Sequence, residues 1–165
     1  MRYRDSPSVE VSTRLSTTPE RAWALVSDIT LPCRFSPELR AVEWLDGDAA
    51  RPPEVGRRFR GVNVNDAMGE WTTEAEVVEI EALRRFVWDV VVNDETSTRW
   101  AFEIDPTSDG VIVRQWGRMG PGFNGITMAI EQMPEKEARI IAGRLSAWRE
   151  AMEANLEGLR GLLER

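Results

Sequence analysis

Residues 134–165 read PEKEARIIAGRLSAWREAMEANLEGLRGLLER, and this closing stretch decides how the rest of the chain is arranged. Its apolar side chains recur every three or four residues, which is the spacing of one face of a helix. They are Ile141, Leu145, Trp148, Met152, Leu156, Leu159 and Leu163. At a rise of about 1.5 Å per residue, the predicted helix is roughly 45 Å long. A stripe of that length needs a long apolar surface to lie on.

The middle of the chain provides such a surface. Between residues 41 and 119, turn signals separate segments in which apolar and polar residues alternate, as they do in strands. The expected strands cover residues 42–45, 56–64, 70–80, 85–92, 96–104 and 110–119, and residues 9–15 add a seventh. Short strands at this spacing predict an antiparallel meander. Because strands and helices do not alternate along the chain, the pattern indicates the α+β class.

The segment after the first strand predicts two short helices. Thr18 is a good N-cap for a helix over residues 19–28, whose first residue is a proline. Residues 33–39 predict the second short helix. Residues 1–7 are polar, so we expect a flexible N-terminal tail, followed by a single domain over residues 8–165.

The composition excludes several classes of function. The net charge is −7 and no run of Lys or Arg offsets it, which argues against binding to nucleic acid. His is absent, which excludes Ser-His-Asp and Cys-His catalysis and the usual zinc sites, and the scattered carboxylates predict no metal site. Cys33 is the single cysteine, so no intrachain disulfide can form. With no signal peptide and no apolar run of about 18 residues, we expect a cytoplasmic protein without a membrane span or a cofactor.

Several local motifs accompany this order of elements. They are Val9–Thr13, Thr18–Asp28, Val55–Asn63, Trp71–Thr73, Phe86–Trp88 and Thr98–Trp100. With the closing helix, they resemble the helix-grip fold of the START-related (SRPBCC) superfamily, in particular its polyketide cyclase/dehydrase and lipid-transport branch. The resemblance spans about residues 8–163. It implies a curved seven-stranded antiparallel sheet wrapped around the long C-terminal helix, with an apolar cavity between them.

Strand alternation indicates which side chains line the concave face. The inward set is Phe59, Asn63, Trp71, Thr73, Phe86, Trp88, Trp100, Phe102 and Gln115. In the last strand we place Gln115 inward because the other face would bury Arg114 and Arg118, although Trp116 on that face leaves the choice open. An apolar wall with a few polar anchors is typical of a small-molecule pocket. The same aromatic side chains are also compatible with a solid core.

The Gly-rich residues 117–125 are either a plain connection between strand and helix or the lid of a pocket. As a lid, they and the residues after them predict a pliable apolar lining from Met119, Phe123, Met128, Ile130 and Met133. On the closing helix, we expect Ile141, Leu145, Trp148 and Met152 to roof the pocket. Leu156, Leu159 and Leu163 are expected to seal a dry core. The predicted ligand-binding set therefore adds Met119, Phe123, Met133, Ile141, Leu145 and Trp148 to the inward set.

Three functions are compatible with these features. The first is the binding or carriage of a hydrophobic small molecule, such as a lipid, a polyketide or an aromatic metabolite. The second is a polyketide cyclase, aromatase or dehydratase, which would have to act without His and with its only Tyr, Tyr3, in the tail. The third is an interaction module, such as a chaperone activator, which requires an exposed apolar patch. No catalytic residue is indicated, Arg34 and Glu38 are candidates for the cavity mouth, and both a monomer and a homodimer are compatible with the sequence.

Overall fold

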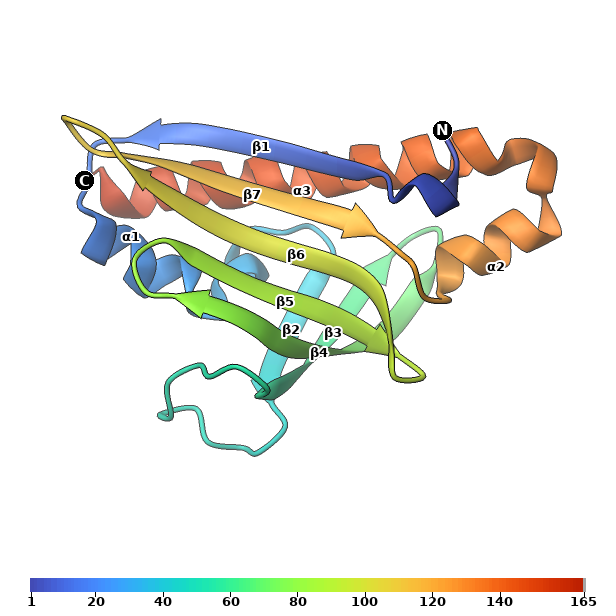
Figure 1. Cartoon of the computed structure of the whole chain (residues 1–165), viewed down its shortest axis with the longest axis horizontal. Helices are drawn as coiled ribbons and strands as arrows, with labels where there is room; N and C mark the ends of the chain where they lie inside the picture. Colours follow the sequence, from blue (N-terminus) through green and yellow to red (C-terminus); the bar gives the residue numbers. More distant parts are fainter. Residues whose placement is uncertain (165) are drawn as a thin grey trace.

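A curled sheet and one long helix make up most of the molecule (Figure 1). The computed structural model describes residues 1–164. Its seven strands are β1 (Ser8–Leu15), β2 (Leu39–Trp44), β3 (Arg58–Asn65), β4 (Gly69–Glu81), β5 (Arg85–Val92), β6 (Glu95–Pro106) and β7 (Val111–Met119). All neighbouring strands are antiparallel, which confirms the predicted α+β helix-grip architecture.

The strands lie in the order β1-β7-β6-β5-β4-β3-β2. Strands β2 to β7 form the predicted meander, and β1 pairs with β7, so that Ser8 lies opposite Arg118 and Leu15 opposite Val111. The most displaced strand prediction is that for β2, which begins at Leu39 and not at residue 42.

The helices agree less closely than the strands with what the sequence predicted. α1 (Pro19–Val26) is capped as predicted, by a hydrogen bond from the Arg21 N–H to Thr18 Oγ1. The second short helix is only a 3-10 turn, η2 (Leu31–Arg34), because the chain enters β2 five residues later. α2 (Gly125–Gln132) was not expected as a separate helix. The closing helix begins after a 3-10 turn, η3 (Pro134–Lys136), and is α3 (Glu137–Leu163).

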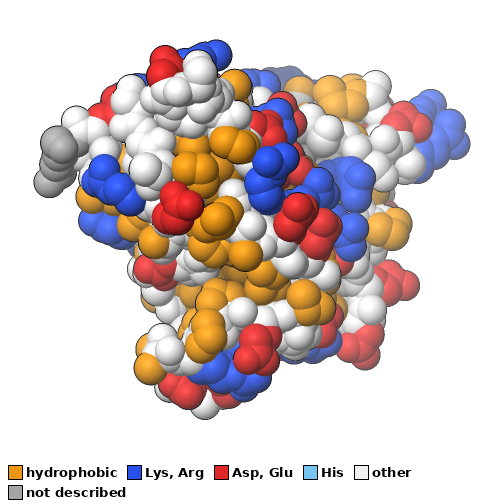
Figure 2. All heavy atoms as spheres, turned by 60° about the vertical axis from the view of Figure 1, so that its left-hand side comes forward, with side chains coloured by type: hydrophobic (Ala, Val, Ile, Leu, Met, Phe, Trp, Pro, Cys, Tyr) orange, Lys and Arg blue, Asp and Glu red, His pale blue; other side chains and the backbone are white. Residues whose placement is uncertain are grey.

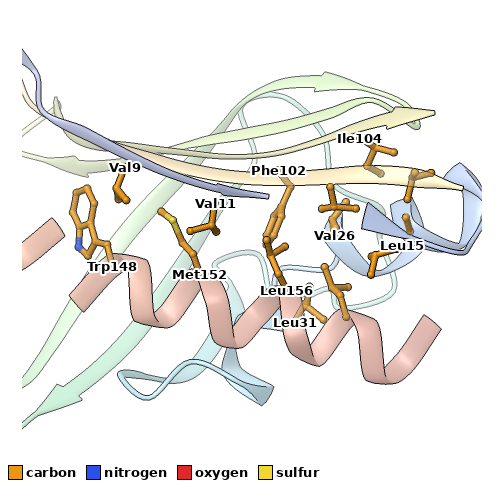
Figure 3. Packing of buried hydrophobic residues seen from close by; sticks show 14 of the residues in the cluster. Val9, Val11, Leu15, Val26, Leu31, Phe102, Ile104, Trp148, Met152 and Leu156 are labelled. Carbon is orange, nitrogen blue, oxygen red and sulfur yellow. The ribbon is translucent and has the colours of Figure 1, made fainter. Parts of the chain in front are cut away.

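The main core lies between α3 and the strands above it (Figure 3). In this view the side chains of α3 point toward those of β1 and β6, with α1 and η2 closing the far end. The labelled members are Val9, Val11, Leu15, Val26, Leu31, Phe102, Ile104, Trp148, Met152 and Leu156. A second cluster joins Phe59, Ala75, Val77 and Phe86 of β3 to β5 to Ile29, which lies between α1 and η2. The predicted apolar stripe of α3 is therefore its buried face.

One contact on α3 depends on a missing side chain. Phe35, just after η2, lies against the helix at Gly158. A Cβ atom added at Gly158 would lie 2.4 Å from Phe35 Cγ, far inside van der Waals contact. Gly143, on the solvent face of the same helix, has no atom within 4 Å of an added Cβ. Of the three glycines in α3, Gly158 is therefore required by packing, whereas Gly143 is not.

The N-terminal residues are in contact with the rest of the molecule. Tyr3, in the 3-10 turn η1 (Tyr3–Asp5), is half-buried, and burial raises the pKa of its hydroxyl. This hydroxyl donates a hydrogen bond to the Gly122 carbonyl at 2.8 Å and accepts one from Asn124 Nδ2 at 2.8 Å. The backbone N–H of Tyr3 donates to Glu137 Oε1 at 2.8 Å. These contacts join Tyr3 to the segment before α2 and to the start of α3, and the expected flexibility of residues 1–7 stays a prediction.

None of the helices in residues 1–164 has the length and apolar character that a membrane crossing requires. Figure 2 shows the end of the molecule that carries α1 and the C-terminal end of α3. Hydrophobic side chains gather in a hollow across the middle of this face, between groups of basic and acidic side chains.

Candidate functional site

A cavity of about 500 Å³ lies between the concave side of the sheet and α3. Its wall takes side chains from β3 to β7, from α2 and α3, and from the segment that connects α1 to β2. The volume lies within the range of small-molecule sites. The inward aromatic side chains therefore line a cavity, and do not fill the space as a solid core.

Eleven of the fifteen predicted site residues lie on this wall. They are Phe59, Asn63, Trp71, Thr73, Phe86, Trp88, Trp100, Phe102, Gln115, Phe123 and Trp148. Contact of these residues with a ligand remains a prediction.

The other four predicted residues do not lie on the wall. Met119 and Ile141 are fully buried in the main core, and Leu145 packs half-buried against that core. The reason is the unexpected helix α2, whose side chains pack against the same cluster at this end of the molecule. Met133 is the C-cap residue of α2 and is not part of the cavity wall.

The choice of the inward face of β7 is confirmed. Gln115 is 3% exposed and lies on the cavity wall. Trp116 is on the outer face of the sheet, with the guanidinium carbons of Arg85 and Arg118 at 5.9 and 5.8 Å from its ring centroid. The cost of burying the two arginines, Arg114 and Arg118, was therefore sufficient to predict which face of β7 points inward.

The roof of the cavity lies about one helical turn further along α3 than predicted. Its residues are Arg144, Trp148, Ala151, Met152 and Asn155. Trp148 and Met152 were predicted to roof the pocket, whereas Ile141 and Leu145 are core residues. Leu156, Leu159 and Leu163 lie in the core, as expected.

Aromatic rings form a nearly continuous wall. The Trp100 and Trp148 ring centroids are 4.5 Å apart, which joins the sheet to α3. Trp88 lies 6.0 Å from Phe102, 5.6 Å from Phe86 and 6.5 Å from Phe59, all tilted. Tilted and edge contacts at these distances are the favourable geometries for aromatic pairs. The wall thus offers ring faces and edges to a flat apolar ligand.

Two buried amides meet on the wall, and one of them was not predicted. Asn155 Nδ2 donates a hydrogen bond to Gln115 Oε1 at 3.1 Å, and Asn155 is only 2% exposed. The second polar atom of Asn155, Oδ1, is buried without a hydrogen-bond partner among the described residues. A signal was present in the sequence: Asn155 lies three residues after Met152 and four before Leu159, inside the apolar stripe.

A β-bulge adds a polar residue, Ser97, that strand alternation could not show, next to Thr98, which is in phase with Trp100 and Phe102. Val90 of β5 lies opposite Thr98, but Val91 lies opposite Thr96, so Ser97 is an extra residue in β6. As a result, Ser97 and Thr98 both lie on the wall. Ser97 Oγ accepts a hydrogen bond from Asn124 Nδ2, and Thr98 Oγ1 accepts one from the Trp100 indole N–H.

An ion pair crosses the wall between the start of β2 and α3. Both terminal nitrogens of Arg144 donate to the Glu38 carboxylate, at 2.7 and 2.9 Å, and Asn65 Nδ2 donates to it at 2.8 Å. Burial alone would raise the pKa of Glu38, but these hydrogen bonds and the charge of Arg144 hold the pKa below its ordinary value. The Arg144 guanidinium also lies 5.6 Å from the Trp71 ring centroid. Arg34, the other candidate for the mouth, is exposed and does not lie on the wall.

The cavity reaches the surface between the β3–β4 turn and the start of α2. Met68, Phe123 and Met128 lie on its wall and are 49%, 42% and 47% exposed. Met68 Cε comes within 3.6 Å of the Cβ position at Gly125, so turn and helix are in contact. Residues 117–125 thus connect β7 to α2 and also form part of the rim.

Few side chains on the wall can ionise. They are Asp28, Glu38 and Arg144, and the last two are paired with each other. In the described part of the chain, no three His, Cys, Asp or Glu side chains come together in a way that could hold a metal ion. The interior of the cavity therefore offers aromatic surface and neutral hydrogen-bonding groups.

A second hollow, of about 260 Å³, lies between α1 and residues 49–53. It shares Asp28 and Ile29 with the larger cavity but has Trp44 as its only aromatic residue. The larger cavity, with its aromatic wall, is therefore the candidate site.

Comparison with known proteins agrees with this geometry. The family described as "Polyketide cyclase / dehydrase and lipid transport" matches residues 6–164. The chain belongs to this family. A comparison with curated proteins found no match. Membership in the family agrees with the fold and leaves open which of the described activities applies.

Solved structures of similar fold include a polyketide-cyclase-like protein and two di-domain ARO/CYC proteins from biosynthetic pathways. A polyketide-cyclase-like protein of Corynebacterium glutamicum is 26% identical, with a TM-score of 0.67, over 96% of this chain and 92% of that one. The di-domain ARO/CYC protein BexL of the BE-7585A biosynthetic pathway has a TM-score of 0.73 at 15% identity, over 97% of this chain and 50% of that one. The di-domain ARO/CYC protein StfQ of the steffimycin pathway has a TM-score of 0.58 at 12% identity, over 95% of this chain and 53% of that one. At these identities the last two show the fold alone, and this chain spans about half of each.

Proposed function

We propose that this protein binds a hydrophobic small molecule in the cavity between its sheet and α3. The observation that carries the proposal is a cavity of about 500 Å³ whose wall is largely aromatic and aliphatic. Transfer of apolar ligand surface into such a site contributes about 25 cal/mol per Å². An apolar rim at Met68, Phe123 and Met128 gives such a ligand a route in from the surface.

Among lipids, polyketides and aromatic metabolites, the wall favours a molecule with rings. Trp88, Trp100, Trp148 and their Phe neighbours present stiff, tilted rings, which stack well on a flat ligand and fit a flexible acyl chain less closely. The description of the family, which names polyketide cyclase and lipid transport, supports both classes.

Titration with anthraquinone, a flat apolar quencher, tests this proposal through tryptophan fluorescence. Of the seven tryptophans, Trp71, Trp88, Trp100 and Trp148 lie on the wall. We expect saturable quenching, and we expect Trp100→Phe to reduce the quenched signal. Trp116→Phe is the matched control, because Trp116 lies on the outer face, and it should leave the quenched signal unchanged. Quenching that does not saturate, or that falls equally in both variants, contradicts a site in the cavity.

A second candidate function is cyclisation or dehydration of a polyketide held in the same cavity. It is favoured by neutral polar groups on an otherwise apolar wall, namely Asn63, Thr73, Gln115 and Asn155. Amide N–H groups can orient a chain and polarise its carbonyls, which lowers the barrier by positioning more than by proton transfer. The fold shared with ARO/CYC proteins also supports this candidate.

Incubation with a linear poly-β-ketone thioester, followed by mass spectrometry, tests the second candidate. A cyclised or dehydrated product that forms with the protein and is lost in Asn63→Ala, while anthraquinone still quenches, supports catalysis. Binding without any product leaves carriage as the function.

A further inference from the structure

The amide pair of Gln115 and Asn155 lies at the inner end of the α3 side of the cavity. Gln115 comes from β7 and Asn155 from α3, and both are at most 3% exposed. Asn155 Nδ2 is satisfied by Gln115 Oε1, but Asn155 Oδ1 has no partner among residues 1–164. A buried polar atom left without a hydrogen bond destabilises the protein, because its lost hydration is not replaced. Asn155 lies on the cavity wall, so a rotation of its side chain that brings Oδ1 to the cavity surface allows a ligand to supply the missing partner.

We propose that this amide pair recognises a hydroxyl group, so that the preferred ligand is an uncharged ring system with a hydroxyl at the end that enters first. This inference rests on the proposed function, because it names the class of molecule that the cavity takes. It assigns to Asn155 a role in specificity.

A hydroxyl is the group that fits this pair best. The Oδ1 atom of Asn155 accepts a hydrogen bond, which a hydroxyl can donate and a ketone cannot. If the amide groups of Gln115 and Asn155 are both rotated by 180°, Gln115 donates to Asn155 instead. The atom of Asn155 without a partner is then Nδ2, which donates a hydrogen bond. A hydroxyl accepts as well as donates, so it satisfies Asn155 in both orientations. An ammonium group or a ketone would satisfy only one of them.

A charged group does not fit this position. The cations and anions on the wall are Arg144, Glu38 and Asp28, and Arg144 is held by Glu38 in a doubly hydrogen-bonded ion pair. A carboxylate placed at Asn155 would be buried with no free cation of the wall to compensate it, which is strongly unfavourable. The head group of a free fatty acid is therefore excluded from the inner end.

The position of the pair along α3 indicates the length of the ligand. Asn155 follows Arg144 by eleven residues, which corresponds to roughly 16 Å along a helix axis. Beyond Asn155, Leu156 and Leu159 belong to the core, so the contribution of α3 to the wall ends there. A molecule that spans the wall from the ion pair to Asn155 must be of similar length, which a system of fused rings can provide.

The side chains around the pair are suited to the ring that carries the hydroxyl. Phe102 lies directly opposite Gln115 in the β6–β7 register and is on the wall. Met152 lies one turn before Asn155 on α3 and is also on the wall. An aromatic edge and a thioether on either side of a buried amide pair can hold a ring while the amides hold its hydroxyl.

Calorimetric titration with fluorene and with hydroxyfluorene, whose hydroxyl is on an outer ring, tests the inference. Hydroxyfluorene should bind wild-type protein roughly tenfold more tightly, since one net hydrogen bond to a buried group is worth about a factor of ten. In Asn155→Leu, the preference should fall to about one, with fluorene binding retained. Gln132→Leu, an exposed amide outside the cavity, is the control and should keep the wild-type preference.

Asn155→Leu leaves the Gln115 amide unpaired, so the double variant Gln115→Met, Asn155→Leu is measured as well. Replacing both partners by apolar side chains of similar size is close to neutral for stability, and this variant should also show no preference. Thermal unfolding of each variant verifies that it is folded.

The outcomes separate the inference from the proposed function. If fluorene and hydroxyfluorene bind wild-type protein equally, a water molecule or nothing occupies the pair, and the inference is wrong while the proposed function stands. A preference that survives in both Asn155 variants also overturns the inference, because the hydroxyl is then bound elsewhere. Tight binding of fluorene carboxylate overturns the exclusion of charge. If no fluorene binds, the proposed function itself fails.

Discussion

At the scale of single residues, Glu38 and Arg144 form the ionic contact that closes the wall between β2 and α3. Each side chain is less than one-fifth exposed, and their bond is bidentate. Such pairs are stronger than surface ion pairs, because their geometry is fixed and water screens them less. The lowered pKa of Glu38 makes this contact measurable by its pH dependence.

Substitution of Glu38 by Gln should destabilise the folded protein at neutral pH and not at low pH. Because the pKa of Glu38 is lower in the folded protein than its ordinary value of 4.5, the carboxylate stabilises the fold above that pH. This contribution is lost as the pH falls through the folded pKa. We expect Glu38→Gln to lower the free energy of unfolding by about 1–2 kcal/mol at neutral pH, as for hydrogen bonds to charged groups.

Urea unfolding of both proteins from neutral pH down to about pH 3 measures the difference. Asp46, Glu54 and Glu164 also have lowered pKa values, but they are common to both proteins and cancel. Glu43→Gln is the control, because Glu43 is exposed and 3.9 Å from Arg60, and it should change stability by less than about 0.5 kcal/mol. A difference for Glu38→Gln that persists at the lowest pH would contradict the assignment.

At the scale of elements, the residues of α3 correspond to the different surfaces that the helix contacts. Its buried face alternates between core contacts, at Leu156 and Leu159, and cavity wall, at Trp148 and Asn155. At Gly158 the helix backbone itself is the contact surface for Phe35. Glycine weakens a helix, so its presence at this position reflects packing and not helix propensity.

Two alanine substitutions on α3 should therefore have opposite effects. Gly158→Ala places a Cβ 2.4 Å from Phe35 Cγ, and overpacking of this kind costs about 1–3 kcal/mol, more than the helix gains. Gly143→Ala meets no atom within 4 Å and should stabilise the protein by up to about 1 kcal/mol. Denaturant unfolding measures both. Combining Gly158→Ala with Phe35→Ala should remove the clash, and equal effects of the two glycine substitutions would refute the packing argument.

The sequence predicted best those elements in which apolar residues recur at a regular spacing. The stripe of α3 and the alternation in β3 to β7 oriented ten of the eleven predicted wall residues, because one buried face per element leaves a clear period. α2 was missed because its eight residues, GITMAIEQ, are short and begin with Gly, and they read equally well as an apolar loop. The bulge at Ser97 shifts the phase of the alternation, but residues 95–98 are all polar, so the shift cannot be recognised in the sequence.

The partners of single polar residues were the least predictable. Tyr3 and Asn124 meet through hydrogen bonds although more than a hundred residues separate them, and nothing in either local sequence indicates the other. Asn155 interrupts an apolar stripe, which marks it as unusual, but its pairing with Gln115 depends on how far α3 slides along the sheet. Such contacts follow from the assembled fold.

At the scale of the whole molecule, the cavity links stability to binding. A ligand at a free concentration of 100 times its Kd stabilises the protein by about 2.7 kcal/mol. For a domain of this size, that corresponds to a rise in Tm of roughly 5–10 °C. We expect anthraquinone or hydroxyfluorene to produce such a shift in wild-type protein, measured by differential scanning calorimetry.

Ala151→Phe should abolish that shift. Ala151 lies on the wall between Trp148 and Asn155, so a phenyl ring there occupies the space of the ligand. The Tm of the ligand-free variant should equal or exceed that of wild-type protein, because the added ring fills an empty volume. Ala142→Phe, the same change on the exposed face of α3, should keep the full ligand shift. If Ala151→Phe keeps the shift as well, the ligand is bound outside this cavity.

The order of the strands also has a consequence for the biosynthesis of the protein. Within this domain β1 is made before β2 to β6, but its partner β7 and the helix beneath it come after them. Strands β2 to β7 can pair one hairpin at a time as they emerge, whereas β1 has no strand to pair with until β7 has been made. While β2 to β6 are synthesised, the nascent chain therefore carries an unpaired strand with the apolar side chains Val9, Val11 and Leu15, and this segment is where a chaperone or an aggregation contact would act first.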